Sequence, residues 1–233
     1  MFYDLHIHSC LSPCAEDEMT PNNICNMAVI KGLQLIAVTD HNSLRQLPSV
    51  SAVARQLGLK MLYGCELESA EEVHMLGLFP DLSISQSFQG WVDSKMPGIP
   101  NQPDFFGKEE ICDAQDQVIA EESRLLLVSL SATLEECVQA VHEYGGRAIL
   151  AHALDRKNSV TTQLGFIPEG LKYDGIELKS MEQKQQLLRM HPWIHEEDTF
   201  WFFDSDAHRL TYISEPVHEI SDETVRRLWG SSV

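Results

Sequence analysis

Short apolar runs alternate with segments of helical spacing along this chain. Seven runs bounded by polar or turn residues fit β-strands, at residues 4–8, 34–39, 60–66, 73–79, 147–151, 174–178 and 199–204. Strands that alternate with helices are typical of parallel sheets, whose strands are joined by crossover helices. The pattern therefore predicts an α/β fold, and a length of 233 residues fits a single domain over 1–233.

Two of the helical segments carry clear boundary signals. Thr20 places a capping hydroxyl before Pro21 at the first helical position, and Gly32 ends the segment. Thr133 and Glu136 form a capping-box pattern ahead of an apolar helix face, which a pair of glycines terminates. We therefore expect a helix directly after each of these threonines.

Residues 80–130 break the alternation, because they contain prolines, glycines and acidic turns. We expect an irregular insertion over one face of the sheet, with a short hairpin between residues 117–119 and 125–128. Such a segment can close over a site as a lid or pack as a structural excursion, and the pattern favours the packed excursion.

Side chains able to bind metal lie at the ends of the predicted strands. Asp4, His6 and His8 alternate along the first strand, which places them on one face. Each candidate alone is explained by a buried hydrogen bond or a helix cap. Because the C-terminal ends of barrel strands meet at one mouth, the candidates together predict a shared site. The others follow or open later strands: Asp40, His41, Glu66, His74, His152, Asp204, Asp206 and His208.

Burying so many ionisable groups is costly unless they are paired or bound to metal. Imidazole and carboxylate ligands suit zinc, manganese or iron, and the sequence does not choose among these metals. We therefore expect divalent cations at this mouth.

The candidates fall into motifs that resemble a known family. The motifs cover nearly the whole chain, and they are Asp4-Leu-His6-Ile-His8-Ser9, Thr39-Asp40-His41, Glu66 at a strand end, Ala151-His152 and Ser205-Asp206-Ala-His208. In type, order and spacing they resemble the PHP (polymerase and histidinol phosphatase) superfamily of metal-dependent phosphoesterases. The resemblance implies a distorted seven-stranded (β/α)7 barrel, similar to a TIM barrel, with a centre of two or three metal ions.

The resemblance also implies how the ligands are shared. One ion would be bound by His6, His8, Glu66 and Asp206; Glu66 would bridge to a second ion held by His74 and His152; His41 and His208 would contribute to a third. Members of the family usually have an Asp or His in the loop after the first two histidines, where this chain has Cys14 closest to that position. A thiolate is a competent ligand for zinc or iron. A free loop thiol and a site with only two ions are the alternatives.

Within such a site we assign catalytic roles to Glu66, Asp206, His208 and Asp40. Glu66 would hold the ions at their separation, and His208 or Asp40 could relay a proton or orient a ligand. Three basic residues near the strand ends are candidates to bind the substrate phosphate, with solvated surface charge as the alternative: Arg156, Lys157 and Arg209. We interpret His142 as a surface or packing residue. The other three histidines are interpreted as surface residues: His191, His195 and His218.

Composition limits the partners of this chain. It has 17 Lys and Arg against 35 Asp and Glu, a formal net charge of -18. Because affinity for phosphate backbones comes largely from basic side chains, this charge disfavours extended nucleic acid and anionic membranes, but not a small phosphorylated substrate. Without an export signal or a long apolar stretch, we expect a cytoplasmic protein with reduced cysteines. The sequence leaves the oligomeric state open.

These features predict a hydrolase of a small phosphate ester, either a phosphomonoester or a short nucleotide, that uses a metal-activated water. One alternative is a phosphodiesterase or 3'-5' exonuclease. Another is an accessory module that binds metal without turnover, and a third is hydrolysis of an amide or lactone at a related binuclear centre.

Overall fold

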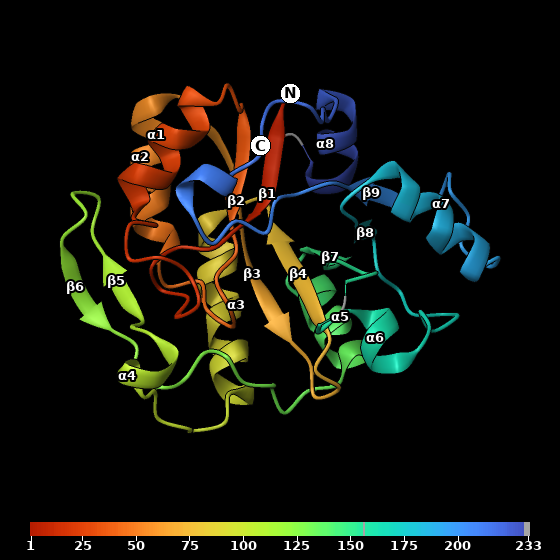
Figure 1. The fold of residues 1–233 in the computed structure, drawn as a ribbon, viewed down its shortest axis with the longest axis horizontal. Coiled ribbons are helices and arrows are strands. Elements are labelled where there is room, and N and C mark those ends of the chain that lie inside the picture. The colour runs from red at the N-terminus through yellow and green to blue at the C-terminus, as the bar shows by residue number, and fades with distance from the viewer. Residues whose placement is uncertain (156, 231–233) are drawn as a thin grey trace.

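The computed structural model describes residues 1–155 and 157–230. Its main feature is a seven-stranded sheet in the order β1-β2-β3-β4-β7-β8-β9 (Figure 1). Each strand coincides with one of the seven predicted runs to within two residues at either end, so the predicted strands are confirmed. They are β1 (Tyr3–Ile7), β2 (Leu35–Val38), β3 (Lys60–Glu68), β4 (His74–Phe79), β7 (Arg147–Leu150), β8 (Gly175–Glu177) and β9 (Phe200–Phe202).

Strand β4 runs antiparallel to both of its neighbours, β3 and β7. The other pairs in the sheet are parallel. The expectation of an all-parallel sheet is therefore wrong at β4, because residues 69–73 are too short a connection for a crossover helix. The reversal brings the N-terminal end of β4 to the same rim as the C-terminal ends of the other strands.

The sheet curls until its two edges meet. The backbone N–H of His8 donates to the carbonyl oxygen of Ala207 at 2.9 Å, and the N–H of Ala207 donates to the carbonyl oxygen of His6 at 3.2 Å. These bonds join β1 to the segment after β9 through an isolated parallel bridge rather than a full ladder. The result is the distorted seven-stranded α/β barrel that the resemblance to the PHP superfamily implies.

Helices surround this barrel (Figure 1). Thr133 and Glu136 form the predicted capping box at the start of α5, so that prediction is confirmed. The helix after Thr20 is also present, but the Thr20 hydroxyl makes no capping hydrogen bond and is buried without a partner, so the predicted cap is wrong. The helices are α1 (Pro21–Ile30), α2 (Leu47–Leu57), α3 (Leu82–Lys95), α4 (Pro103–Phe106), α5 (Leu134–Glu143), α6 (Val160–Leu164), α7 (Met181–Met190) and α8 (Asp222–Trp229), with a 3-10 turn at Leu210–Tyr212.

Apolar side chains fill the barrel and close one of its ends. Leu5 and Leu62 pack inside the barrel together with Leu228 of α8. The indole N–H of Trp229, also in α8, donates to the carbonyl oxygen of Leu78 at 3.2 Å. A second, larger cluster packs the outer face of the sheet against the helices. Since α8 seals one end with apolar groups, the polar groups of the barrel gather at the opposite rim.

The insertion at residues 80–130 is more regular than the sequence suggests. It begins with the 14-residue helix α3, where the Asp81 side chain accepts a hydrogen bond from the backbone N–H of Ser83. It also contains a separate hairpin of β5 (Glu110–Cys112) and β6 (Val118–Glu121), which lies at one side of the molecule (Figure 1). The predicted partner strand at residues 125–128 is wrong, because the Asp113 side chain accepts two backbone N–H groups and turns the chain earlier.

Two histidines outside the rim have structural contacts. His191 is buried rather than on the surface, and its Nε2 accepts the backbone N–H of Ile167 at 3.0 Å. The Nε2 atom of His142 lies 2.7 Å from a carboxylate oxygen of Asp174. The surface interpretation is therefore wrong for His191, whose ring packs beside Trp193.

All six cysteines are free thiols, as expected for a chain without a disulfide framework. Among the residues that the structure describes, none of the helices combines the length and the apolar character that a membrane span needs.

Candidate metal centre

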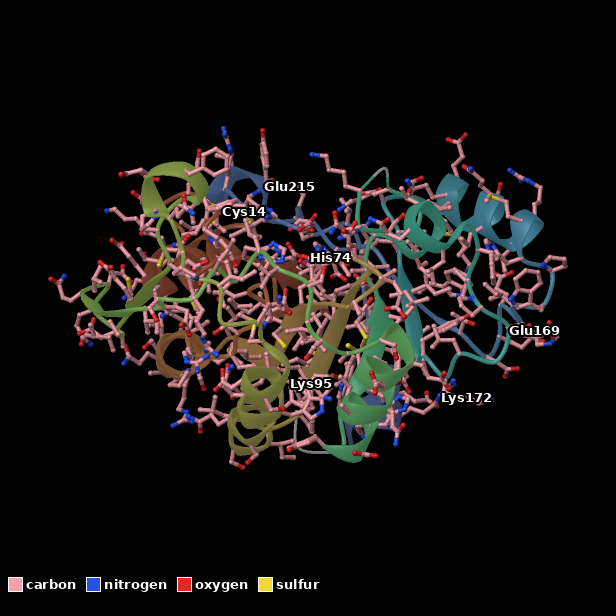
Figure 2. All side chains as sticks on the ribbon, turned by 90° about the horizontal axis from the view of Figure 1, so that it is seen from below. Cys14, His74, Lys95, Glu169, Lys172 and Glu215 are labelled. Atoms are coloured by element: carbon pink, nitrogen blue, oxygen red, sulfur yellow. The ribbon has the colours of Figure 1, made fainter. Side chains whose placement is uncertain are left out.

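The open rim of the barrel holds a cavity of about 1050 Å³. Six of the predicted metal-binding residues line it: His41, Glu66, His74, His152, Asp206 and His208. Cys14 lines it too; Cys14 and His74, both labelled in Figure 2, come from different parts of the chain. The antiparallel direction of β4 explains why His74, which opens a strand, lies beside residues that close strands.

Glu66, at 1% side-chain exposure, is the centre of the cluster. Its Oε2 atom lies 3.0 Å from Nδ1 of His41, and its Oε1 atom lies 2.9 Å from Nδ1 of His74. The same Oε1 atom lies 3.0 Å from Nε2 of His152. Three imidazoles from three different segments therefore aim a ring nitrogen at one carboxylate, as expected for a bridging ligand.

His6, His8 and Asp206 form a second part of the cluster. The two imidazoles place their Nε2 atoms 3.2 Å apart, and Asp206 Oδ1 lies 3.4 Å from one and 3.2 Å from the other. Both Nε2 atoms also lie 3.4 Å from oxygens of Glu66. Two imidazole nitrogens that face each other cannot both accept, or both donate, the hydrogen bond between them. A cation bound between these nitrogens and the carboxylate oxygens would satisfy all of them.

Buried partners hold the outer nitrogens of these two imidazoles. His6 Nδ1 lies 2.7 Å from Oε2 of Glu177, and His8 Nδ1 lies 3.0 Å from the Ser12 hydroxyl. Ser12 in turn donates to Asp40 at 2.7 Å, so it accepts the proton of His8. When Nδ1 of a neutral ring donates its proton to these acceptors, Nε2 would present its lone pair to a cation in the cluster.

The sequence interpretation missed Glu177 and Ser12. The available signal for Glu177 was its position as a carboxylate that ends an apolar strand, the same position that identified Glu66.

His208 completes the rim. Its ring stacks on that of His8 with centroids 4.2 Å apart, and its Nδ1 lies 2.9 Å from the carbonyl oxygen of Asp206. On the other side of the cavity, Nε2 of His74 lies 3.5 Å from a carboxylate oxygen of Glu68. The ligand atoms of His8, His41 and His208 lie within 4.8 Å of one another, so the third predicted ion position also has imidazole nitrogens close to it.

Charges in the cluster are mixed. Although burial opposes ionisation, His74 and other imidazoles hold the pKa of Glu66 well below its usual value. Burial likewise opposes protonation of His74, but Glu66 raises its pKa to about 10. Burial and the neighbouring His8 lower the pKa of His41 to about 3 and that of His208 to about 4. Some imidazoles at this rim are therefore neutral, which is the form that binds metal.

Backbone strain concentrates at the same rim. His152 and Asp206 have φ angles of 29° and 55°, and Asn42, next to His41, has 46°. Positive φ is unfavourable for residues other than glycine and persists where the surrounding structure enforces it, often at functional sites. Asn42 is held by its side-chain amide, which donates to the carbonyl oxygens of Leu126 and Val128 at 2.9 and 2.8 Å.

The donor set fits divalent metal. Several buried nitrogen and carboxylate ligands converge here, which suits zinc, manganese or iron. Cys14 is exposed at the cavity wall, so its role as a ligand stays a prediction. Three groups have ligand atoms within 4.8 Å of one another: His6, His8 and Asp206; His8, His41 and His208; and His41, Glu66 and His74.

Three acidic candidates do not line the cavity: Asp4, Asp40 and Asp204. Asp40 is 2% exposed and accepts hydrogen bonds from the backbone and hydroxyl of Ser9 and from Ser12, so it positions the loop after β1. Asp4 accepts from the backbone N–H of Ser205 at 3.1 Å. The predicted shared face of Asp4 with the two histidines is wrong, because the pairing of β1 with β2 shifts register after Asp4.

The predicted phosphate-binding residues are dispersed. Lys157 lines the cavity and is exposed. Arg209 does not line it; its guanidinium lies 3.2 Å from Glu16 and over the ring of Tyr212. Arg156 lies outside the described residues.

A buried cluster of imidazoles and carboxylates at the open rim of a seven-stranded barrel defines the class of protein as a metal-dependent hydrolase. The PHP domain family matches residues 4–189, and the chain belongs to that family. This membership confirms the resemblance seen in the sequence motifs.

Three relatives illustrate the similarity. A 5'-3' exoribonuclease of Haemophilus influenzae is 22% identical over 88% of this chain and 89% of its own length. A protein of Bifidobacterium adolescentis assigned as a metal-dependent phosphoesterase superposes with a TM-score of 0.64 at 22% identity, over 97% of this chain and 94% of its own. The lesion-specific endonuclease EndoQ of Pyrococcus furiosus has the same TM-score and identity over 98% of this chain. The chain spans 55% of the length of that endonuclease.

Proposed function

We propose that this chain hydrolyses a small phosphate ester, a phosphomonoester or a short nucleotide, with two or three divalent ions held at the rim. The observation that carries the proposal is the convergence of the Glu66 cluster on one open cavity of about 1050 Å³. Cavities near this size accept metabolite-sized ligands. Leu127 and Leu154 add apolar walls against which the organic part of such an ester can pack.

Divalent ions bound here would lower the pKa of a water molecule and neutralise the oxygens of a phosphate. The residues of the chain hold the geometry for this chemistry. Glu66 keeps the ring nitrogens of His41, His74 and His152 within about 3 Å of one carboxylate. His208, with 29% of its side chain exposed at the cavity, is placed to hold or move a proton at its free Nε2 atom.

The test is phosphate release by metal-reconstituted protein from a panel of phosphomonoesters and mononucleotides, with zinc, manganese and iron loaded separately. Asp206→Ala is the matched control, because this side chain contacts both His6 and His8 at the cavity edge. We expect release by the wild-type protein that falls at least a hundredfold in the variant. No release above the variant across the panel would remove the support for an esterase.

Elemental analysis of the same samples gives metal identity and the number of ions per chain. Three ions per chain would favour Cys14 as a metal ligand. Two ions would favour Cys14 as a free thiol in the loop. Full metal occupancy without hydrolysis of any ester would favour an accessory module that binds metal without turnover. Hydrolysis of amides or lactones alone would favour an amide or lactone hydrolase.

A nuclease is the second candidate, since two of the relatives are named as nucleases. One structure of Endonuclease Q contains a 27-mer duplex with an abasic lesion and superposes with a TM-score of 0.62. This finding weakens the expectation that extended nucleic acid does not bind.

The relative from Haemophilus influenzae is named for 5'-3' degradation, opposite to the 3'-5' direction considered from the sequence. Digestion of an oligonucleotide labelled at either end distinguishes the two directions and an internal cut.

The cytoplasmic location stays a prediction from the sequence alone.

A further inference from the structure

Lys179 brings a positive charge to the rim from the end of β8. Its Nζ atom lies 4.0 Å from Oδ2 of Asp206 and 3.7 Å from Oε1 of Glu177. About a third of the side chain, 34%, is exposed. Among the described residues, Lys179 is the only Lys or Arg whose cationic nitrogen lies within 4.0 Å of a predicted metal-binding carboxylate.

The ammonium group of Lys179 has unused hydrogen-bonding capacity. It carries three N–H donors. In the described structure it makes one hydrogen bond, a long one of 3.4 Å to the carbonyl oxygen of Ser205. Both carboxylate distances exceed those of a hydrogen bond, so these contacts are Coulombic. The donors of Lys179 are therefore available to an anion that enters beside Asp206, which lines the cavity.

The position of Lys179 does not depend on its side-chain contacts. Its backbone N–H donates to the Gln183 side chain at 2.7 Å, and Ser180 caps α7 directly after it. Glu177 contacts His6 through Oε2, whereas Lys179 lies near the other oxygen, Oε1. Removing the ammonium therefore leaves the hydrogen bond that orients His6 in place.

We propose that Lys179 binds a phosphate oxygen of the substrate and is a catalytic residue of this site. The inference rests on the proposed esterase function and adds a cation to those that the sequence interpretation predicts, which are Arg156, Lys157 and Arg209. A lysine ammonium is a compact point charge that pairs well with phosphate oxygens. From the β8 side it contributes a donor that the imidazole cluster does not supply.

The first test measures binding of inorganic phosphate to metal-loaded protein by calorimetry, which requires no turnover. The variants are Lys179→Met and Lys179→Arg, with Lys172→Met as the matched control. Lys172 is exposed and lies well away from His74 in Figure 2. We expect Lys179→Met to weaken phosphate binding about tenfold or more, Lys179→Arg to retain part of the affinity, and Lys172→Met to change nothing.

The second measurement is the number of metal ions per chain in each variant, together with kcat/KM on any ester that the wild type hydrolyses. Unchanged metal content with weaker phosphate binding supports the inference. Wild-type protein that binds no phosphate, a Lys179→Met variant that binds it within twofold of wild type, or one that loses metal would overturn it. Absence of ester hydrolysis by the wild type counts against the proposed function instead, because the phosphate titration still reports on Lys179.

Discussion

Substitution of Glu177 tests what orients the His6 ring at the metal centre. Its carboxylate is fully buried and lies 2.7 Å from His6 Nδ1. The change Glu177→Gln keeps the shape but replaces a charged acceptor by a neutral amide. We expect metal affinity to fall by about 10- to 100-fold, as is usual for partners of ligating histidines. Competition with a chromophoric chelator measures this affinity.

The matched control for this prediction is Glu121→Gln, which changes the same charge on the exposed strand β6. Equal metal affinities of the two variants would show that Glu177 does not orient a ligand. Circular dichroism of both variants separates a loss of affinity from a loss of fold.

At the scale of residues, the search for polar side chains at strand ends identifies the side chains that line the cavity. It does not identify Ser12 and Glu177, which contact the outer ring nitrogens of His8 and His6. His41, Glu66 and Asp206 stand out because polar groups are unexpected at the end of an apolar strand. Ser12 and Glu177 do not stand out, because only the folded structure shows which ring nitrogen each one holds. The placement of a supporting residue depends on tertiary contacts that no local pattern encodes.

At the scale of elements, two threonines that look alike in sequence differ in the structure. The Thr133 hydroxyl accepts the N–H of Glu136 at 3.2 Å, whereas the Thr20 hydroxyl makes no capping bond. We expect Thr133→Ala to lower the free energy of unfolding by about 1 kcal/mol, a typical value for a lost N-cap. Thr20→Ala is the control and should cost clearly less.

Urea unfolding of both alanine variants measures this difference. Metal content should be unchanged in each, since neither threonine contacts the rim. If the two variants lose equal stability, the capping box does not contribute as the geometry indicates.

The insertion supplies a pH-dependent prediction. Glu109 is 2% exposed; its Oε1 accepts the N–H of Leu126 at 2.8 Å, and its Oε2 has no partner. Burial raises the pKa of Glu109 from 4.5 to about 7, with Glu122 adding to the shift against the Leu126 hydrogen bond and the charge of Arg124. Since the folded state holds this proton more tightly, its contribution to stability is complete below pH 4.5 and is lost as pH rises through about 7.

The change Glu109→Gln keeps an acceptor for Leu126 and removes the titration. We expect the variant to be more stable than wild type by about 1 kcal/mol at pH 8, and the difference to vanish near pH 4.5. Urea unfolding across this range in both proteins measures it, and groups at the metal centre titrate alike in both. A difference that stays constant with pH would contradict the assigned pKa.

Strand direction was the element property that the sequence could not supply. Apolar runs identify strands but do not indicate their direction, so the pattern predicts a parallel β4. The short link between β3 and β4 was the usable clue, because a crossover needs roughly a dozen residues. In the insertion, prolines at positions 97, 100 and 103 obscured the helix that ends before them.

At the scale of the whole molecule, charge separates the two candidate functions. The net charge of -18 repels a polyanion, and the partly exposed Arg45 and Arg124 are already paired with Asp93 at 2.8 and 2.9 Å. A protein that binds extended nucleic acid through six to ten phosphate contacts loses about 10³- to 10⁵-fold in affinity between 50 and 200 mM salt. The excess of acidic over basic side chains therefore opposes an extended series of phosphate contacts.

We therefore expect the affinity of metal-loaded protein for a fluorescent 20-nucleotide single strand, measured by anisotropy, to change less than about threefold between 50 and 200 mM salt. The physical reason is that a single phosphate held at the rim releases few counterions, while added salt also screens the repulsion from the acidic surface. Phosphate binding in the same buffers is the internal control, because it depends on the rim alone. A steep loss of oligonucleotide affinity with salt, with phosphate binding unchanged, would identify a basic track along the surface and favour the nuclease.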